Sequence, residues 1–217
     1  FLKNEELLEA LNSRYAVKQF EKRSVDIDDL DDIVTSILQL TPTSFWLQWY
    51  KFIIVKDDKT RELLKEHSWG QSQVTDSDMY VVFTVPTNFD KSFIEKYVYS
   101  IQQSRWMPDE KRDWVIWFMD EAIFKKWPNI WIDNIEEWLT RQAYIGLWNL
   151  MTSLAILWID SCPLEWLNPI EYNKILWLNK LNLSAKVAIA IWKRSPDDKY
   201  QSDTKVRFSK DDLFITV

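Results

Sequence analysis

The sequence predicts an α+β sandwich, in which helices cover a β-sheet. Three short runs rich in β-branched and aromatic residues are predicted strands, at residues 50–55, 80–85 and 185–192. Segments with helical spacing separate these runs, and the last residues, 213–217, are again strand-like. Strands separated by helices are typical of this fold class. The 217 residues suffice for one core, and no repeat, linker or charge block divides them, so we expect a single domain over residues 1–217.

Several segments with helical periodicity are predicted helices. Thr41 and Pro42 end the second of these segments. Pro108 divides the fourth segment into two helices, and Asn168 followed by Pro169 caps the last. The predicted helices cover residues 4–12, 26–40, 57–66, 90–126 (as a pair), 133–159 and 168–178, with a polar loop at 70–76.

The longest helical segment, residues 133–159, is apolar around most of its surface. A membrane-spanning helix is the alternative to a buried core helix. Residues 143–159 fall short of the roughly 20 residues that a span needs, and they include polar residues such as Asn149, so we favour the core helix. Residues 160–165 are expected to form a turn at its end.

Composition narrows the classes of protein. The net charge of −6, from 27 Lys plus Arg and 33 Asp plus Glu, argues against a general nucleic-acid-binding protein. The single cysteine, Cys162, excludes an internal disulfide, and with no obvious cation beside it we expect a buried, unreactive thiol. No signal peptide is visible, so we expect the cytoplasm. The single histidine, His67, leaves a histidine triad or a zinc site without partners, so no metal is expected.

Two cations stand four residues apart near the start of the chain. In an extended segment Arg14, Ala16 and Lys18 point to the same side, so two positive groups face one direction. This geometry suits an oxyanion ligand, although two solvated surface cations are the alternative. Lys205 and Arg207 repeat the alternation near the other end of the chain. A local anion site is therefore a candidate in this acidic protein.

Four stretches carry a resemblance that covers nearly the whole chain. They are Arg-Tyr-Ala-Val-Lys-Gln-Phe at 14–20, Thr-Pro-Thr-Ser at 41–44, residues 160–165, and Lys-Val-Arg at 205–207. In this order they resemble the nitroreductase family of FMN-dependent oxidoreductases. The resemblance implies a nitroreductase-like sandwich with a central mixed β-sheet, helices on its faces, a long buried central helix, and a C-terminal strand exchanged in a homodimer. It also implies that residues from about 90 to 130 form a variable helical excursion covering the active site.

The same resemblance assigns the four cations to FMN. Arg14, Lys205 and Arg207 match cations that contact the phosphate, and Lys18 matches the cation near N1 and O2 of the ring. Three cations can neutralise a phosphate, and a cation beside N1 stabilises the anionic reduced flavin. Hydride transfer through a flavin needs no catalytic side chain, so none is assigned.

The remaining candidates also come from the resemblance. Gln71 and Gln73 offer amides to the pyrimidine edge of the ring, and some members of the family have lysine where this chain has Gln73. Thr43 and Ser44 match hydroxyl positions that approach the cofactor from the other subunit, although both are more often turn residues. The main chain at 163–165 is expected against N5 and O4. The full candidate set is Arg14, Tyr15, Ala16, Lys18, Pro42, Thr43, Ser44, Gln71, Gln73, Pro163, Leu164, Glu165, Trp166, Lys205 and Arg207.

The composition of the chain is unusual, because it is rich in tryptophan and poor in glycine. The chain has 14 Trp and only 2 Gly, whereas glycine usually makes up about 7% of residues. Trp166 is expected close to the flavin. Crowding of a packed core, at about 1 to 3 kcal/mol per site, is expected at Trp46, Trp148, Trp158 and Trp192. The tryptophans at positions where the resemblance leads us to expect glycine are Trp46, Trp148, Trp158, Trp166, Trp177 and Trp192.

These observations favour an FMN-dependent oxidoreductase that passes electrons from NAD(P)H to a nitroaromatic, a quinone or a similar small aromatic acceptor by a ping-pong mechanism. The expected assembly is a cytoplasmic homodimer without a nucleic-acid or membrane partner. The alternative is a folded but inactive, flavin-free scaffold in which the tryptophans block the cofactor site.

Overall fold

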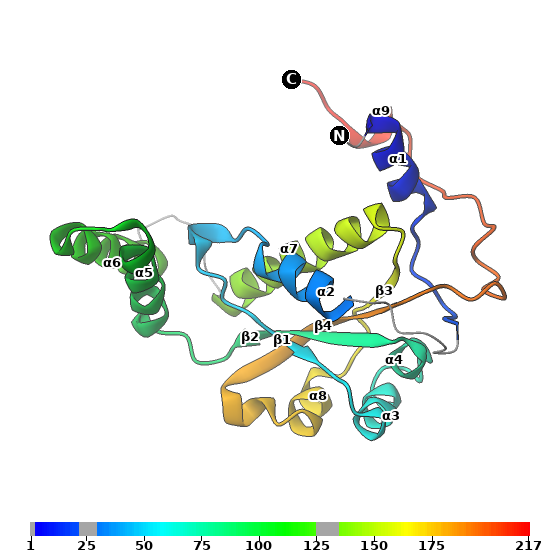
Figure 1. The fold of residues 1–217 in the computed structure, drawn as a ribbon, viewed down its shortest axis with the longest axis horizontal. Coiled ribbons are helices and arrows are strands. Elements are labelled where there is room, and N and C mark those ends of the chain that lie inside the picture. Colours follow the sequence, from blue (N-terminus) through cyan, green and yellow to red (C-terminus); the bar gives the residue numbers. More distant parts are fainter. Residues whose placement is uncertain (1–2, 22–29, 125–134) are drawn as a thin grey trace.

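The computed structural model of this chain describes residues 3–21, 30–124 and 135–217 (Figure 1). Its helices bear out the predicted helical segments wherever the chain is described. Parts of three predicted helices, at 26–29, 125–126 and 133–134, lie outside the described residues. The helices are α1 (Asn4–Ser13), α2 (Leu30–Gln39), α3 (Asp58–Glu66), α4 (Gln73–Asp76), α5 (Lys91–Arg105), α6 (Asp109–Phe124), α7 (Ile135–Ile156), α8 (Pro169–Ile175) and α9 (Lys210–Leu213), with 3-10 turns at Ser44–Trp46 and Leu178–Leu181. The short α4 lies in the predicted loop at 70–76.

Side-chain caps explain where several helices begin. The Asp57 carboxylate accepts a hydrogen bond from Thr60 N at 2.8 Å and starts α3. Asn168 Oδ1 accepts from Ile170 N at 3.1 Å, directly before Pro169 in α8, as the sequence predicted. Such caps satisfy N–H groups that have no acceptor within the helix.

The sheet consists of β1 (Lys51–Ile54), β2 (Met79–Pro86), β3 (Asp160–Leu164) and β4 (Leu183–Trp192). Its order is β1-β2-β4-β3, and every pair is antiparallel. The prediction of a mixed sheet therefore differs from the sheet that the described residues of one chain form. The predicted central position of residues 185–192 is confirmed, because β4 lies between β2 and β3.

The prediction of a turn at 160–165 is wrong, because most of these residues form the edge strand β3. Ser161 and Cys162 pair with Ile191 and Ala190 of β4. Pro163 suggested a turn, but proline is also tolerated on an edge strand, where its missing N–H need not serve a second neighbour.

Within the described single chain, the strand-like tail predicted at 213–217 is not part of the sheet. Ser209 caps the short helix α9 by accepting a hydrogen bond from Asp212 N at 3.2 Å. After α9, residues 214–217 pair with no strand of the described chain, and Phe214 and Ile215 are 70% and 92% exposed. A strand requires hydrogen-bonding neighbours, and among the described residues this tail has no strand partner.

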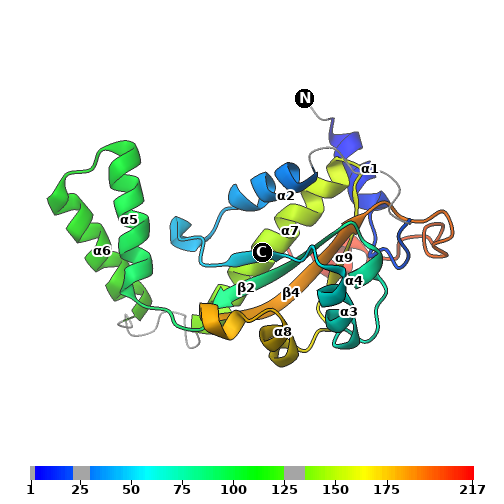
Figure 2. The same ribbon diagram turned by 60° about the horizontal axis from the view of Figure 1, so that its bottom comes forward.

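Helices cover both faces of the sheet. Figures 1 and 2 show α2 and α7 on one face and α3, α4 and α8 on the other. Side chains of β2 alternate between the two layers: Val81 and Phe83 belong to the core cluster with α2 and α7, and Tyr80 and Val82 to the second cluster. The α+β sandwich is thus confirmed, with both faces of the central strands buried.

The long helix α7 forms the centre of the first layer, as predicted. Leu139, Ala143, Leu150 and Leu154 on this helix are fully buried. Asn149, which argued against a membrane span, donates to the Thr41 hydroxyl at 2.9 Å. Within residues 3–21, 30–124 and 135–217, none of the helices combines the length and apolar character required to cross a bilayer.

The pair α5–α6 projects away from the sheet as a helical hairpin (Figure 2). The two helices are divided at residues 106–108, as Pro108 predicted. This projecting hairpin corresponds to the predicted excursion at about 90–130, of which residues 125–130 lie outside the described residues.

Among the described residues, five tryptophans occupy the left-handed backbone region, which strongly favours glycine. All five are at least 61% exposed: Trp46 (φ 58°), Trp69 (φ 57°), Trp106 (φ 45°), Trp158 (φ 57°) and Trp177 (φ 56°). Core crowding is therefore the wrong expectation at Trp46, Trp148 and Trp158, which are exposed. Trp192 is 2% exposed and does lie in the core. Of the six tryptophans at positions where glycine was expected, three, Trp46, Trp158 and Trp177, have a backbone conformation that disfavours any side chain.

Candidate functional site

The segment that follows α1 carries two of the candidate cations and lies against the edge strand β3. Arg14 has extended backbone angles, φ −70° and ψ 138°. Val17 N donates to the Ser161 carbonyl of β3 at 3.5 Å, and Ser195 N donates to the Gln19 carbonyl at 2.9 Å. Residues 14–20 are thus held between β3 and the chain that follows β4.

Lys205 brings the far end of the chain to this segment. Its ammonium group donates to the Leu11 carbonyl at 2.7 Å and to the Arg14 carbonyl at 2.6 Å, across 191 residues in the second case. Burial and then the charge of Arg207 lower the pKa of Arg14, and burial followed by the charges of Arg14 and Arg207 lowers the pKa of Lys205. Among the described residues, no carboxylate forms an ion pair with these three cations. The structure brings together three positive groups that repel one another.

Gln73 and Cys162 lie beside the same segment. The Gln73 side chain is almost fully buried, and its amide nitrogen donates to the Val17 carbonyl at 3.3 Å and to the Cys162 sulfur at 3.8 Å. Burial raises the pKa of the Cys162 thiol, although the charges of Lys18 and Arg14 oppose this shift. Two cations therefore do lie near the thiol, contrary to the expectation from sequence, but burial dominates and keeps it protonated.

Tyr15 and Ala16 pack on the second core cluster. The guanidinium of Arg194 lies 4.7 Å from the centre of the Tyr15 ring, and its Nε donates to Asp160 at 2.8 Å. Burial, followed by the negative charge of Asp198, raises the pKa of Tyr15 to about 12. The buried Tyr15 hydroxyl has no hydrogen-bond partner among the described residues. The roles of Asp160, Arg194 and Asp198 could not be predicted from the sequence, because contacts between distant residues leave no local pattern.

The residue that follows β3, Glu165, contacts helix α7. Pro163 and Leu164 are strand residues, and Leu164 is buried. Glu165 is exposed and accepts a hydrogen bond from the Tyr144 hydroxyl of α7 at 2.5 Å. Burial and then Glu165 raise the pKa of Tyr144. These two side chains line a hollow of about 610 Å³ on the exposed side of α7.

Two loops meet next to β3. The rings of Trp166 and Trp69 lie 4.7 Å apart with an angle of 34° between their planes. Gln71 follows in the same loop as Trp69, and its amide donates to the Ser68 carbonyl at 3.1 Å. The loops that carry Gln71 and Trp166 are therefore neighbours, as the candidate site requires.

Residues 42–44 lie elsewhere in the subunit. Ser44 N donates to Gln142 Oε1 of α7 at 2.8 Å, and Thr43 Oγ1 accepts from Gln48 N at 3.0 Å. Within the described chain, no hydrogen bond joins them to the segment at 14–18. The described chain therefore brings together most of the candidate residues but leaves Pro42, Thr43 and Ser44 apart from the cations.

Comparison with known proteins places this geometry in a family. The model of the Nitroreductase family matches residues 11–191. The chain belongs to the Nitroreductase family. Membership makes it an oxidoreductase enzyme. A relative from Bacillus subtilis, "Putative NAD(P)H nitroreductase YfkO", is 26% identical over 218 residues, covering 91% of this chain and 93% of the relative.

Solved structures of similar fold agree with this assignment. The crystal structure of "putative nitroreductase ydfN" from Bacillus subtilis matches with a TM-score of 0.82 at 17% identity, over 99% of this chain and 100% of the other. A "putative nitroreductase in complex with FMN" from Exiguobacterium sibiricum matches with a TM-score of 0.81 at 14% identity, over 97% of both chains. At these identities the structures show a shared fold, which confirms the nitroreductase-like sandwich.

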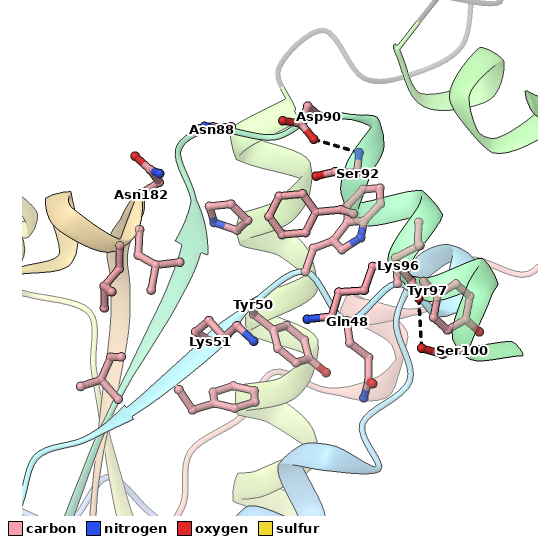
Figure 3. Close-up of a pocket in the computed structure, with 18 residues that line it drawn as sticks. Gln48, Tyr50, Lys51, Asn88, Asp90, Ser92, Lys96, Tyr97, Ser100 and Asn182 are labelled. Atoms are coloured by element: carbon pink, nitrogen blue, oxygen red, sulfur yellow. Dashed lines mark hydrogen bonds between the residues drawn. The ribbon is translucent and has the colours of Figure 1, made fainter. Parts of the chain in front are cut away.

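A second pocket, larger than the one beside Tyr144 and Glu165, lies away from the cation-bearing segment. It has a volume of about 720 Å³ and lies between β1, the beginning of α5 and residues 181–183 (Figure 3). Tyr50, Lys51 and Lys96 are among its lining residues, and none of the candidate cofactor-binding residues is. Within one subunit, the projecting hairpin α5–α6 therefore borders this hollow and not the cations.

Proposed function

We propose that this enzyme is an FMN-dependent oxidoreductase that passes electrons from NAD(P)H to a nitroaromatic, a quinone or a similar acceptor in a ping-pong cycle. The observation that carries the proposal is the cluster of Arg14, Lys205 and Arg207, which has no carboxylate partner among the described residues. The names of the relatives, which include NAD(P)H nitroreductase and an FMN complex, support the donor and the cofactor.

The donor set fits the phosphate of FMN. Burial, and after it mutual repulsion, lowers the pKa values of Arg14 and Lys205, and an added dianion would remove that repulsion. Guanidinium groups also match phosphate oxygens in pairs. The three cations would therefore hold the phosphate, and Lys205 would in addition fix the main chain at Arg14 through its two carbonyl contacts.

The ring would lie along the same segment. Lys18 would hold positive charge near N1 and O2, and Gln71 would donate to the pyrimidine edge. Because the amide nitrogen of Gln73 is engaged by the Val17 carbonyl, only its carbonyl oxygen would be left for the ring. Bound FMN supplies the hydride chemistry, and the chain binds and orients it. The main chain at 163–165, with Trp166 next to it, would border the other edge.

The proposed assembly is a cytoplasmic homodimer of single-domain subunits. A second subunit would bring Pro42, Thr43 and Ser44 to the cofactor, since one subunit leaves them apart from the cations. The tail after α9 exposes Phe214 and Ile215, and β1 is an edge strand that pairs on one side only within the described sheet. An exchanged C-terminal strand would cover apolar side chains and satisfy backbone groups at once.

Reconstitution tests the proposal. The purified chain is titrated with FMN, and the bound flavin is counted from its visible absorbance. NADH and NADPH oxidation is then followed with a quinone acceptor. We expect one FMN per subunit and acceptor reduction that depends on FMN. A chain that takes up no FMN and oxidises neither donor would instead support the inactive, flavin-free scaffold.

A further inference from the structure

Asp198 is a buried carboxylate whose contacts lie on the cation-bearing segment. It is 1% exposed and follows β4 in the loop Ser195-Pro196-Asp197-Asp198. Its Oδ2 accepts hydrogen bonds from Lys18 N at 2.8 Å and Gln19 N at 3.1 Å, and its Oδ1 accepts from Tyr200 N at 3.0 Å. One carboxylate therefore joins two main-chain stretches 180 residues apart.

These contacts keep Asp198 ionised. Burial alone would raise the pKa of its carboxyl, but hydrogen bonds from the N–H groups of Tyr200, Lys18 and Gln19 outweigh burial and lower that pKa. Hydrogen bonds to a charged group are stronger than those between neutral groups. Among the described residues, no ion pair joins this carboxylate to the Lys18 ammonium group.

The position of these bonds matters because the charges of Lys18 and Arg14 both act on the Cys162 thiol, which lies beside this segment. Two N–H groups directed at one carboxylate fix the orientation of the peptide units at Lys18 and Gln19. Ser195 N, from the same loop as Asp198, holds the Gln19 carbonyl at 2.9 Å. The loop at 195–198 thus binds both N–H groups and a carbonyl group of the backbone at Lys18 and Gln19.

We propose that Asp198 is a positioning residue, whose carboxylate holds the backbone at Lys18 and Gln19 so that Lys18 and Arg14 face the same ligand. This inference rests on the proposed function, because the ligand is FMN. The positioning role of Asp198 differs from the phosphate-binding role of Lys205 and Arg207. Displacing the segment would move Lys18 and Arg14 together, and would therefore change contacts to the ring as well as to the phosphate.

The test compares Asp198→Asn with Asp197→Asn in the full-length chain. Asp197 is the adjacent, exposed carboxylate and serves as a matched control. Each variant is titrated with FMN and with riboflavin well below its melting temperature. For Asp198→Asn we expect both affinities to fall, that for riboflavin by roughly tenfold, the equivalent of one charge-assisted hydrogen bond, and that for FMN by at least as much, because Arg14 also contacts its phosphate. Asp197→Asn should match the parent chain.

A second variant gives a readout that a purely structural role would not move. Asn also removes a negative charge, which by itself would raise the reduction potential of a nearby flavin. Asp198→Glu keeps the negative charge but displaces the carboxylate oxygens and with them the backbone at Lys18. Lys18 then stabilises the anionic reduced flavin less, so the reduction potential of bound FMN should fall below that of the parent protein. Asp198→Glu also decides the matter if Asp198→Asn does not fold.

The outcomes are distinct. A lower melting temperature with unchanged flavin affinities and an unchanged potential would show that Asp198 only stabilises the fold, and would overturn the inference. Loss of FMN affinity without loss of riboflavin affinity would also overturn it. If the parent chain binds no FMN, the proposed function fails, and the positioning role fails with it.

Discussion

The substitution Trp158→Gly should separate backbone strain from side-chain packing. Trp158 follows the end of α7 with φ 57°, and the hydrogen bonds Trp158 N to Ala155 O at 3.0 Å and Ile159 N to Leu154 O at 2.9 Å close the helix there. This pair of bonds is the Schellman arrangement, in which glycine is the usual residue at the left-handed position. A side chain there costs about 1–2 kcal/mol.

Trp148→Gly is the matched control. Trp148 lies within α7, the helix whose end Trp158 follows; it is 58% exposed, against 61% for Trp158, and its backbone is not left-handed. Both substitutions remove a similar apolar area and add similar freedom to the unfolded chain, so these contributions nearly cancel in the comparison. Only Trp158→Gly relieves the left-handed conformation. It should therefore leave the protein about 1–2 kcal/mol more stable than Trp148→Gly does.

Urea unfolding of the two flavin-free variants measures this difference, from the midpoints and from slopes that should agree. In a chain of this size 1 kcal/mol corresponds to roughly 2–4 °C in melting temperature, so a thermal scan can check the result. Equal stabilities, or a less stable Trp158→Gly variant, would refute the reasoning and show that side-chain contacts at Trp158 outweigh its backbone conformation.

Three further predictions follow from the site. Lys205→Ala and Arg207→Ala should weaken FMN binding far more than riboflavin binding, as measured by flavin fluorescence, while Lys210→Ala in the same tail changes neither; equal losses for both flavins would contradict the phosphate assignment. Removal of residues 213–217 should convert a dimer at micromolar concentration into monomers with weaker flavin binding, as measured by sedimentation, and a parent chain that is monomeric with flavin bound would contradict the exchange. Because burial and Asp198 raise the pKa of Tyr15 from 10.0 to about 12, the neutral hydroxyl is favoured in the folded state, and stability should fall as pH rises from about 10 through 12. In Tyr15→Phe this decrease should be smaller, and identical pH profiles would count against it.

Sequence periodicity predicted the elements that depend on burial alone. The apolar face of α7 and the β-branched run of β4 are buried in the structure as their patterns indicated. Elements that depend on a neighbour were harder to predict. Pro163 suggested a turn, yet β3 exists because β4 offers it a full hydrogen-bonding edge. The strand-like tail at 214–217 pairs with neither edge of the described sheet, and it stays outside the sheet.

The candidate site shows the same dependence on distant partners. The spacing of Arg14 and Lys18 indicates a shared side, but nothing local to Lys205 shows that its ammonium contacts the Arg14 carbonyl. Only the resemblance to a family joined the two ends of the chain. Asp198 had no such signal, because an aspartate after Ser-Pro is an ordinary turn residue in sequence. Its burial depends on the main chain at Lys18, which supplies the N–H group that stabilises its charge. A buried carboxylate and an extended cation-bearing segment thus each require the other, and a substitution at either should disturb both.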